Sequence, residues 1–80
     1  MNISQAVRER ISELRQEQGL TINRLSDISG VTQSTVNDIV KGKSYSTGIA
    51  TIKKLCDGLG ISIRDFFDSD IFDDVEQEVK

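Results

Sequence analysis

Two short amphipathic segments, separated by a single tight turn, constrain the fold of this chain more than any other feature. Residues 21–30 carry apolar side chains at helical spacing, namely Ile22, Leu25 and Ile28. Gly30 suits a left-handed turn at the end of this helix, and Thr32 suits the cap of the next one. Only Gly30 and Val31 then remain for the connection. The spacing therefore predicts a helix-turn-helix unit.

The second of these segments, expected to be helical over about 33–41, separates two kinds of chemistry. Its polar arc holds Gln33, Ser34, Asn37, Asp38 and Lys41. The opposite side holds Thr35, Val36, Ile39 and Val40. Ordinary solvated helices use Glu and Lys for solubility, whereas amides and hydroxyls both donate and accept, as reading base edges in a major groove requires. A polar surface helix without a function is the alternative interpretation of this segment alone.

A longer series of motifs extends this pattern over residues 11–67. In order, it reads Leu14-Arg15, Gly19-Leu20-Thr21, Leu25-Ser26, Ser29-Gly30-Val31-Thr32-Gln33-Ser34-Thr35-Val36, Ile39, Lys41-Gly42-Lys43, Thr51-Ile52, Leu55-Cys56, Leu59-Gly60-Ile61-Ser62 and Phe66-Phe67. The series resembles the lambda-repressor and Cro type of helix-turn-helix domain, the XRE family. This resemblance implies an all-α fold, a compact bundle of about five helices that binds duplex DNA with the helix after Thr32 as its recognition helix.

Length and composition limit what else the chain can be. Eighty residues allow one domain, which we place at residues 1–67, followed by an acidic tail at 68–80 whose apolar spacing is compatible with a helix. One Cys and no His exclude disulfide frameworks, zinc fingers and His-based catalysis, so we predict no enzyme activity, no metal and no cofactor. Cys56 is expected in the core. No apolar run reaches membrane-spanning length and no signal peptide is evident, which predicts a cytoplasmic protein without a membrane partner.

The absence of Pro and the helical period of the apolar residues independently favour an all-α protein. We expect a first helix capped by Asn2 or Ser4 that runs to about Gln18, with inward residues Val7, Ile11 and Leu14. The charges on its outer face alternate in sign, which is typical of a solvated surface.

Two further helices are expected after a polar loop at residues 43–48. Thr47 is the expected cap of the fourth helix, whose apolar stripe is Ile49, Ile52, Leu55, Cys56 and Leu59. Ser62 and Asp65 have the spacing of a capping box that starts the fifth helix. Its apolar residues, Ile63, Phe66 and Phe67, are expected to complete the core.

The acidic tail repeats an apolar pattern that fits one stripe of a short helix, formed by Ile71, Phe72, Val75 and Val79. Such a stripe packs either on its own domain or on a second copy. Regulators of the resembling type usually pair, so that two recognition helices enter successive major grooves. We therefore predict a homodimer, at least on DNA, and leave open whether the tail forms it.

The net charge of −3 by itself argues against a nucleic-acid partner. The charges are, however, unevenly distributed between residues 1–67 and the tail. Up to Phe67 there are nine cations, Arg8, Arg10, Arg15, Arg24, Lys41, Lys43, Lys53, Lys54 and Arg64. The same residues include seven anions, Glu9, Glu13, Glu17, Asp27, Asp38, Asp57 and Asp65. The tail contains six acidic residues and Lys80. The acidity thus belongs mainly to the tail.

The resemblance also implies which residues meet DNA. Base contacts are predicted for Gln33, Ser34, Asn37 and Asp38, with Gln33 and Asn37 each able to grip an adenine. Phosphate contacts are predicted for Thr21, Asn23, Arg24, Thr32, Thr35, Lys41, Lys43, Ser44 and Tyr45. Two positions depart from the family, which commonly has Gln where Ile22 stands and Pro where Thr47 stands. Asp38 can accept from a cytosine amino group, but its charge repels nearby phosphates, so it is either a selectivity device or a residue that faces away from the DNA.

Together these observations predict a bacterial or phage transcriptional regulator that binds double-stranded DNA sequence-specifically. The alternative is a protein-interaction module with the same fold, such as an antitoxin-like partner. Ile22, Asp38 and the acid-rich tail favour that alternative, whereas the polar face beside Lys41 and Lys43 favours the DNA-binding regulator.

Overall fold

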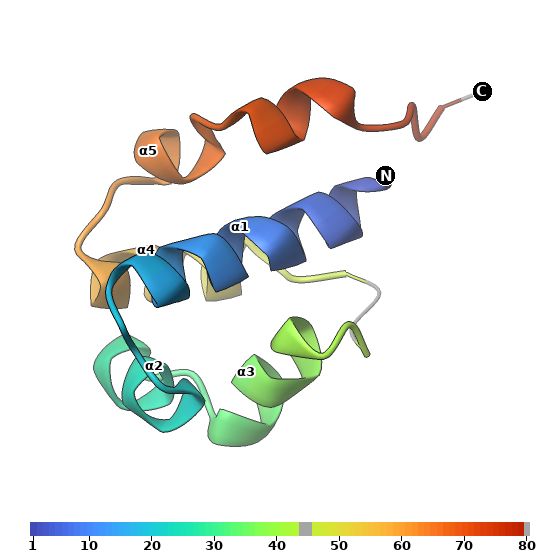
Figure 1. Ribbon diagram of the computed structural model, residues 1–80. Coiled ribbons are helices and arrows are strands. Elements are labelled where there is room, and N and C mark those ends of the chain that lie inside the picture. Colours follow the sequence, from blue (N-terminus) through green and yellow to red (C-terminus); the bar gives the residue numbers. More distant parts are fainter. Residues whose placement is uncertain (44–45, 80) are drawn as a thin grey trace.

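Helices account for all the regular secondary structure in the residues that the computed structural model describes, 1–43 and 46–79. There are five α-helices, α1 (Ile3–Glu17), α2 (Ile22–Ser29), α3 (Gln33–Val40), α4 (Ile49–Leu59) and α5 (Ile63–Phe67), followed by a 3-10 helix, η1 (Asp70–Asp74). In Figure 1, α1 crosses the middle of the molecule, with α2 and α3 below it and α5 and η1 above. The expected all-α bundle of about five helices is confirmed.

One apolar face of each α-helix contributes to a single core. Its buried residues are Val7, Ile11, Leu14, Leu25, Val31, Val36, Ile39, Ile52, Leu55, Cys56, Leu59 and Phe66. Burial raises the pKa of the Cys56 thiol, because the low-polarity surroundings disfavour the thiolate. Cys56 is thus a core residue, as predicted. No helix among the described residues has the length and apolarity needed to cross a membrane.

The predicted caps hold most of these helices in place. The Asn2 side chain accepts from the Gln5 N–H at 2.8 Å, and the Gln5 side chain accepts from the Asn2 N–H at 2.9 Å, which is a complete capping box for α1. Thr21, Thr32 and Ser62 each accept a backbone N–H at the start of α2, α3 and α5. For α5 the bond from the Asp65 N–H to Ser62 is the first half of the expected box.

Two expectations about the helix faces were wrong. Gly48, not Thr47, is the N-cap of α4, and the helix begins one residue later than a Thr47 cap would give. Ile49 therefore opens the first turn and is 66% exposed, so it is not part of the core stripe. Thr35 is also exposed, because it lies in the first turn of α3 and its hydroxyl accepts from the Thr32 hydroxyl at 2.9 Å.

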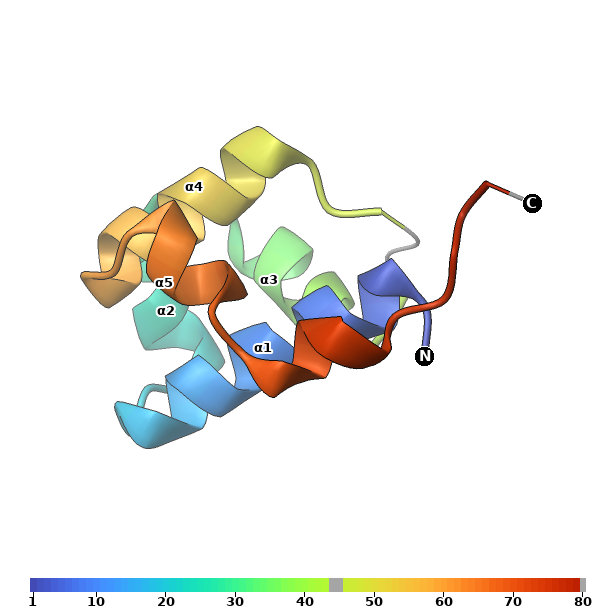
Figure 2. The same ribbon diagram turned by 90° about the horizontal axis from the view of Figure 1, so that it is seen from above.

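The tail is a 3-10 helix followed by an extended segment, so the predicted single stripe on a short helix was wrong. Phe72 packs against the core, with its ring centroid 4.9 Å from that of Phe67. The Glu76 N–H then donates to the Met1 carbonyl at 3.0 Å, and Val79 is 85% exposed. Figure 2 shows η1 running alongside α1 towards the N-terminus. The tail thus packs on its own domain through Phe72.

Candidate nucleic-acid interface

The turn between α2 and α3 is fixed by three hydroxyl contacts and one glycine. Gly30 adopts a left-handed conformation, with φ of 71°, which a residue with a side chain rarely adopts. The Ser26 hydroxyl donates to the Val31 carbonyl at 2.5 Å, and the Val31 N–H donates to the Ser29 hydroxyl at 3.3 Å. The buried Ser29 hydroxyl itself donates to the Leu25 carbonyl at 2.6 Å. These contacts set the direction in which α3 leaves the turn.

An open depression of about 420 Å³ lies at the surface, between the start of α2 and the start of α3. It is lined by Ile22, Gln33, Ser34 and Asn37. Gln33 and Ser34 are exposed and Asn37 is half-buried. The structure thus brings three of the four predicted base-reading side chains together, where their amide and hydroxyl groups can both donate and accept.

Asp38, the fourth predicted base contact, lies elsewhere. It lines a separate depression of about 220 Å³ between the end of α3 and the start of α4, together with Thr35, Ile39, Lys43, Ser46, Thr47, Gly48 and Thr51. Asp38 is a half-buried residue that shares this depression with Lys43 and not with Gln33 and Asn37. The structure therefore does not group Asp38 with the other three residues.

The predicted phosphate contacts comprise hydroxyls, one amide and cations. The exposed Thr21 hydroxyl accepts from the Arg24 N–H at 3.0 Å, and the Thr32 hydroxyl donates to that of Thr35. Thr35 therefore keeps its own hydroxyl hydrogen for an outside acceptor. Four further side chains are exposed at the start of α2 and the end of α3, namely Asn23, Arg24, Lys41 and Lys43. Ser44 and Tyr45 lie outside the described residues.

Arg8 is a cation that the sequence did not assign to this surface. A Cβ built on Gly42 would collide with the Arg8 guanidinium, so this side chain from α1 lies against the end of α3. Gly42 itself has a φ of 75°, the left-handed conformation in which glycine is favoured. Arg8 thus joins Lys41 and Lys43 around the same end of the helix. Its alternation with neighbouring acids suggested only a solvated face, because sequence spacing does not reveal a contact between α1 and α3.

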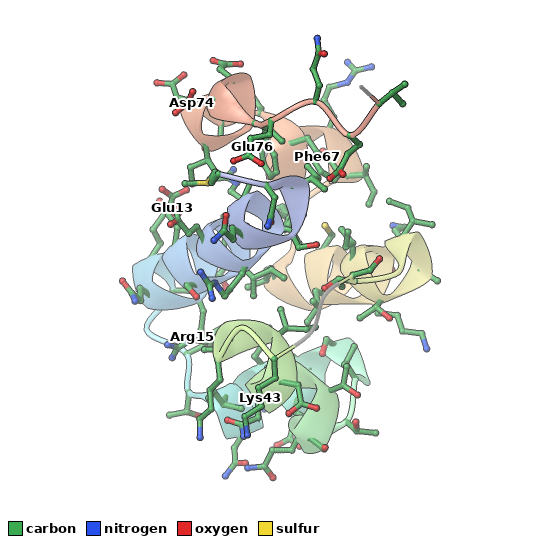
Figure 3. The ribbon with its side chains drawn as sticks, turned by 90° about the vertical axis from the view of Figure 1, so that its right-hand side faces the viewer. Glu13, Arg15, Lys43, Phe67, Asp74 and Glu76 are labelled. Carbon is green, nitrogen blue, oxygen red and sulfur yellow. The ribbon has the colours of Figure 1, made fainter. Side chains whose placement is uncertain are left out.

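The acidic tail, residues 68–79 of the described chain, lies on the side of the molecule opposite to α3. Figure 3 shows Asp74 and Glu76 at one end and Lys43 at the other, with α1 between them. The Glu76 carboxylate is 3.9 Å from the amino group of Met1, at the same end as the tail. The negative charge of residues 68–79 is therefore kept away from α3, so it opposes an anionic partner of α3 only weakly.

Comparisons with known proteins agree with this geometry. The helix-turn-helix family model matches residues 11–66. The HTH-type transcriptional regulator PuuR of Escherichia coli K12 is 41% identical over 59 residues, which cover 74% of this chain and 31% of PuuR. The HTH-type transcriptional repressor RghR of Bacillus subtilis is 42% identical over 53 residues, which cover 66% of this chain and 39% of RghR. The chain thus spans well under half the length of these two relatives.

A solved structure extends the match to nearly the whole bundle. The crystal structure of the prophage Lp1 protein 11 superposes with a TM-score of 0.75 and 46% sequence identity. The match covers 86% of this chain and 92% of that one. The lambda-repressor-like arrangement of helices is therefore shared by fold as well as by sequence.

Proposed function

Because the chain belongs to the helix-turn-helix family, we propose that it is a transcriptional regulator that binds duplex DNA sequence-specifically and reads the major groove with α3. The relatives that match it are named as transcriptional regulators and repressors, which supports this proposal. The expected absence of enzyme activity fits the same role.

The observation that carries the proposal is the open depression at the start of α3. Gln33 and Asn37 present side-chain amides there, and each can form the paired donor and acceptor contacts that adenine N7 and N6 offer in the major groove. Ser34 adds a hydroxyl that suits several bases. Because these groups both donate and accept, the face matches the edges of base pairs.

Positive charge beside this face supports the same proposal. Lys41, Lys43 and Arg8 surround the end of α3, where they can neutralise backbone phosphates and set the register of the helix on the duplex. The exposed hydroxyls of Thr21 and Thr35 can add neutral phosphate contacts. Asp38 stays a predicted base contact, to a cytosine amino group, from its separate position.

We also expect the protein to act as a homodimer on DNA and to be located in the cytoplasm. Pairing would place two copies of α3 in successive major grooves, about 34 Å apart. Both expectations are predictions that follow from the proposed role.

Two substitutions test the separation between base reading and phosphate binding. Gln33→Ala should raise the Kd for a preferred duplex by about 5- to 150-fold, equivalent to roughly 1–3 kcal/mol, and should leave random duplex unaffected. Lys43→Ala should weaken binding to both and reduce the slope of log K against log salt by about one. The preferred duplex is selected from a random pool with the full chain, and binding is measured at several salt concentrations.

The matched control is Gln16→Ala, which removes an exposed amide from α1 and should leave both affinities unchanged. Equal losses on preferred and random duplexes for Gln33→Ala would show that Gln33 does not read bases. Failure of the full chain to bind any duplex at low salt would overturn the proposal itself.

A further inference from the structure

The side chain of Ile22 is the one apolar member of the depression that otherwise presents Gln33, Ser34 and Asn37. It comes from the first residue of α2, whereas the three polar residues come from α3. Ile22 is half-buried: part of it packs against the core, and part of it borders the depression. A hydrocarbon surface therefore lies directly beside the groups that are proposed to read bases.

The four bases differ in whether they offer an apolar group at this point. In the major groove, adenine, guanine and cytosine present hydrogen-bonding atoms, while thymine adds the C5 methyl group. An amide beside a hydrocarbon surface therefore complements an adenine next to a thymine better than it complements the edge of a G·C pair. Ile22 has no side-chain donor or acceptor, so it cannot make the phosphate contact that a glutamine would make there.

We propose that Ile22 is a specificity-determining residue that contacts the C5 methyl group of a thymine, next to the base bound by Gln33 or Asn37. This inference rests on the proposed function, because it assigns a further base contact to the same surface. It predicts that a preferred duplex contains a thymine whose methyl group contributes to binding. The contribution of one buried methyl group corresponds to roughly a 4-fold change in Kd.

The test removes the methyl group from the DNA and the hydrocarbon from the protein. Each thymine of the selected duplex is replaced in turn by deoxyuridine, which keeps every hydrogen-bonding atom and lacks only the methyl group. For the wild-type chain, one thymine position in each half-site should be sensitive, and its replacement alone should weaken binding about 4-fold. In Ile22→Ala, the same replacement should have no effect.

Two controls separate methyl recognition from loss of folding. The thymine-to-uracil ratio of Kd values is measured within each variant, so a reduced folded fraction cancels. Ile22→Gln, whose side chain is polar and one atom longer, should bring the ratio of Kd values to about one, as Ile22→Ala does. Ile49→Ala removes an exposed isoleucine outside the depression, and its ratio of Kd values should equal that of the wild-type chain.

The outcomes distinguish this inference from the function on which it rests. If the wild-type chain prefers a duplex but no thymine is sensitive, or if the ratio persists in both Ile22 variants, the assignment of Ile22 is overturned while the proposed function stands. If no duplex is preferred over random DNA, the proposed function fails and the assignment fails with it.

Discussion

At the scale of single residues, Gly58 shows how one position sets the distance between two helices. A Cβ built there would lie 2.9 Å from the Ile28 carbonyl oxygen and 2.9 Å from the Ser29 backbone. Real Cβ atoms do not approach backbone this closely, so α4 can pack against the end of α2 only where it has no side chain. Because α3 leaves from the end of α2, this contact also helps to position the proposed reading helix.

Gly58→Ala should therefore destabilise the protein. Alanine in a helix interior is normally favoured over glycine by about 0.5–1 kcal/mol, but here the backbone of α2 must move, and we expect the free energy of unfolding to fall by about 1–3 kcal/mol. Urea denaturation measures the change. Lys54→Ala, an exposed substitution on the same helix, should stay within about 0.5 kcal/mol of wild type. A Gly58→Ala variant at least as stable as wild type would contradict the close approach.

Two residue-level predictions from the sequence, the Thr32 cap and the Gly30 turn, were confirmed because their determining contacts are local. Thr32 caps α3 through a residue three positions away, and Gly30 turns the chain at its own position, so spacing alone identifies both. Arg8 and Asp38 depend on contacts between distant segments. Nothing in the spacing of α1 shows that Arg8 reaches Gly42, or that Asp38 faces the start of α4.

At the scale of the element, α3 is a helix of eight residues that depends on its cap. Short helices are marginal by themselves, since nucleation costs more than a few hydrogen bonds return. The Thr32 hydroxyl accepts from the Thr35 N–H at 3.2 Å and satisfies one of the free donors at the start of the helix. In contrast, α4 has Gly48 as its N-cap and no side-chain cap bond, and it forms without one because it is longer and deeply packed.

Thr32→Ala should lower the free energy of unfolding by about 1 kcal/mol, since a hydroxyl cap is typically worth that much. Thermal or urea denaturation without DNA measures this change apart from any phosphate contact. Thr32→Ser should restore most of the loss because serine keeps the hydroxyl, and Ser34→Ala, an exposed substitution in the first turn of the same helix, should change little. Equal losses in Thr32→Ala and Ser34→Ala would show that the cap is not the cause.

At the scale of the whole molecule, the tail closes the bundle at the side away from α3. Phe72 packs against Phe66 and Phe67 at centroid distances of 6.1 and 4.9 Å, and α1 is covered in turn by η1. The Arg10 side chain also donates to the Phe66 and Asp65 carbonyls at 2.7 Å, tying α1 to α5 just before the tail begins. The packing of Phe72 thus holds the acidic residues of the tail beside α1 and α5.

Phe72→Ala should reduce the free energy of unfolding by about 1–3 kcal/mol, less than a fully buried phenylalanine, because Phe72 is half-buried. Val79→Ala, at an exposed position of the same tail, should change it by less than about 0.5 kcal/mol. Sedimentation at several concentrations should give the same mass for Phe72→Ala and wild type. A lower mass with unchanged stability would instead make Phe72 part of a contact between two copies.

The tail is also where sequence patterning was least informative about the whole molecule. The apolar spacing of Ile71, Phe72, Val75 and Val79 fits an α-helix, but the chain turns as a 3-10 helix and then extends, with Val75 at φ of −100° and ψ of 135°. The pairing of Glu76 with Met1 joins the two ends of the described chain, which no local pattern contains. The five-helix bundle was predictable because four of the helices have a side-chain cap at their start and each of the five has its own apolar face.

In the proposed complex, DNA contacts the protein through α3 and the start of α2. A titration of isotope-labelled full chain with its selected duplex, followed by amide chemical shifts, tests this most directly. We expect the largest chemical-shift changes at residues 21–24 and 32–43, and almost none at residues 68–79. Changes concentrated in the tail or on the outer face of α1, with residues 32–43 unmoved, would contradict it.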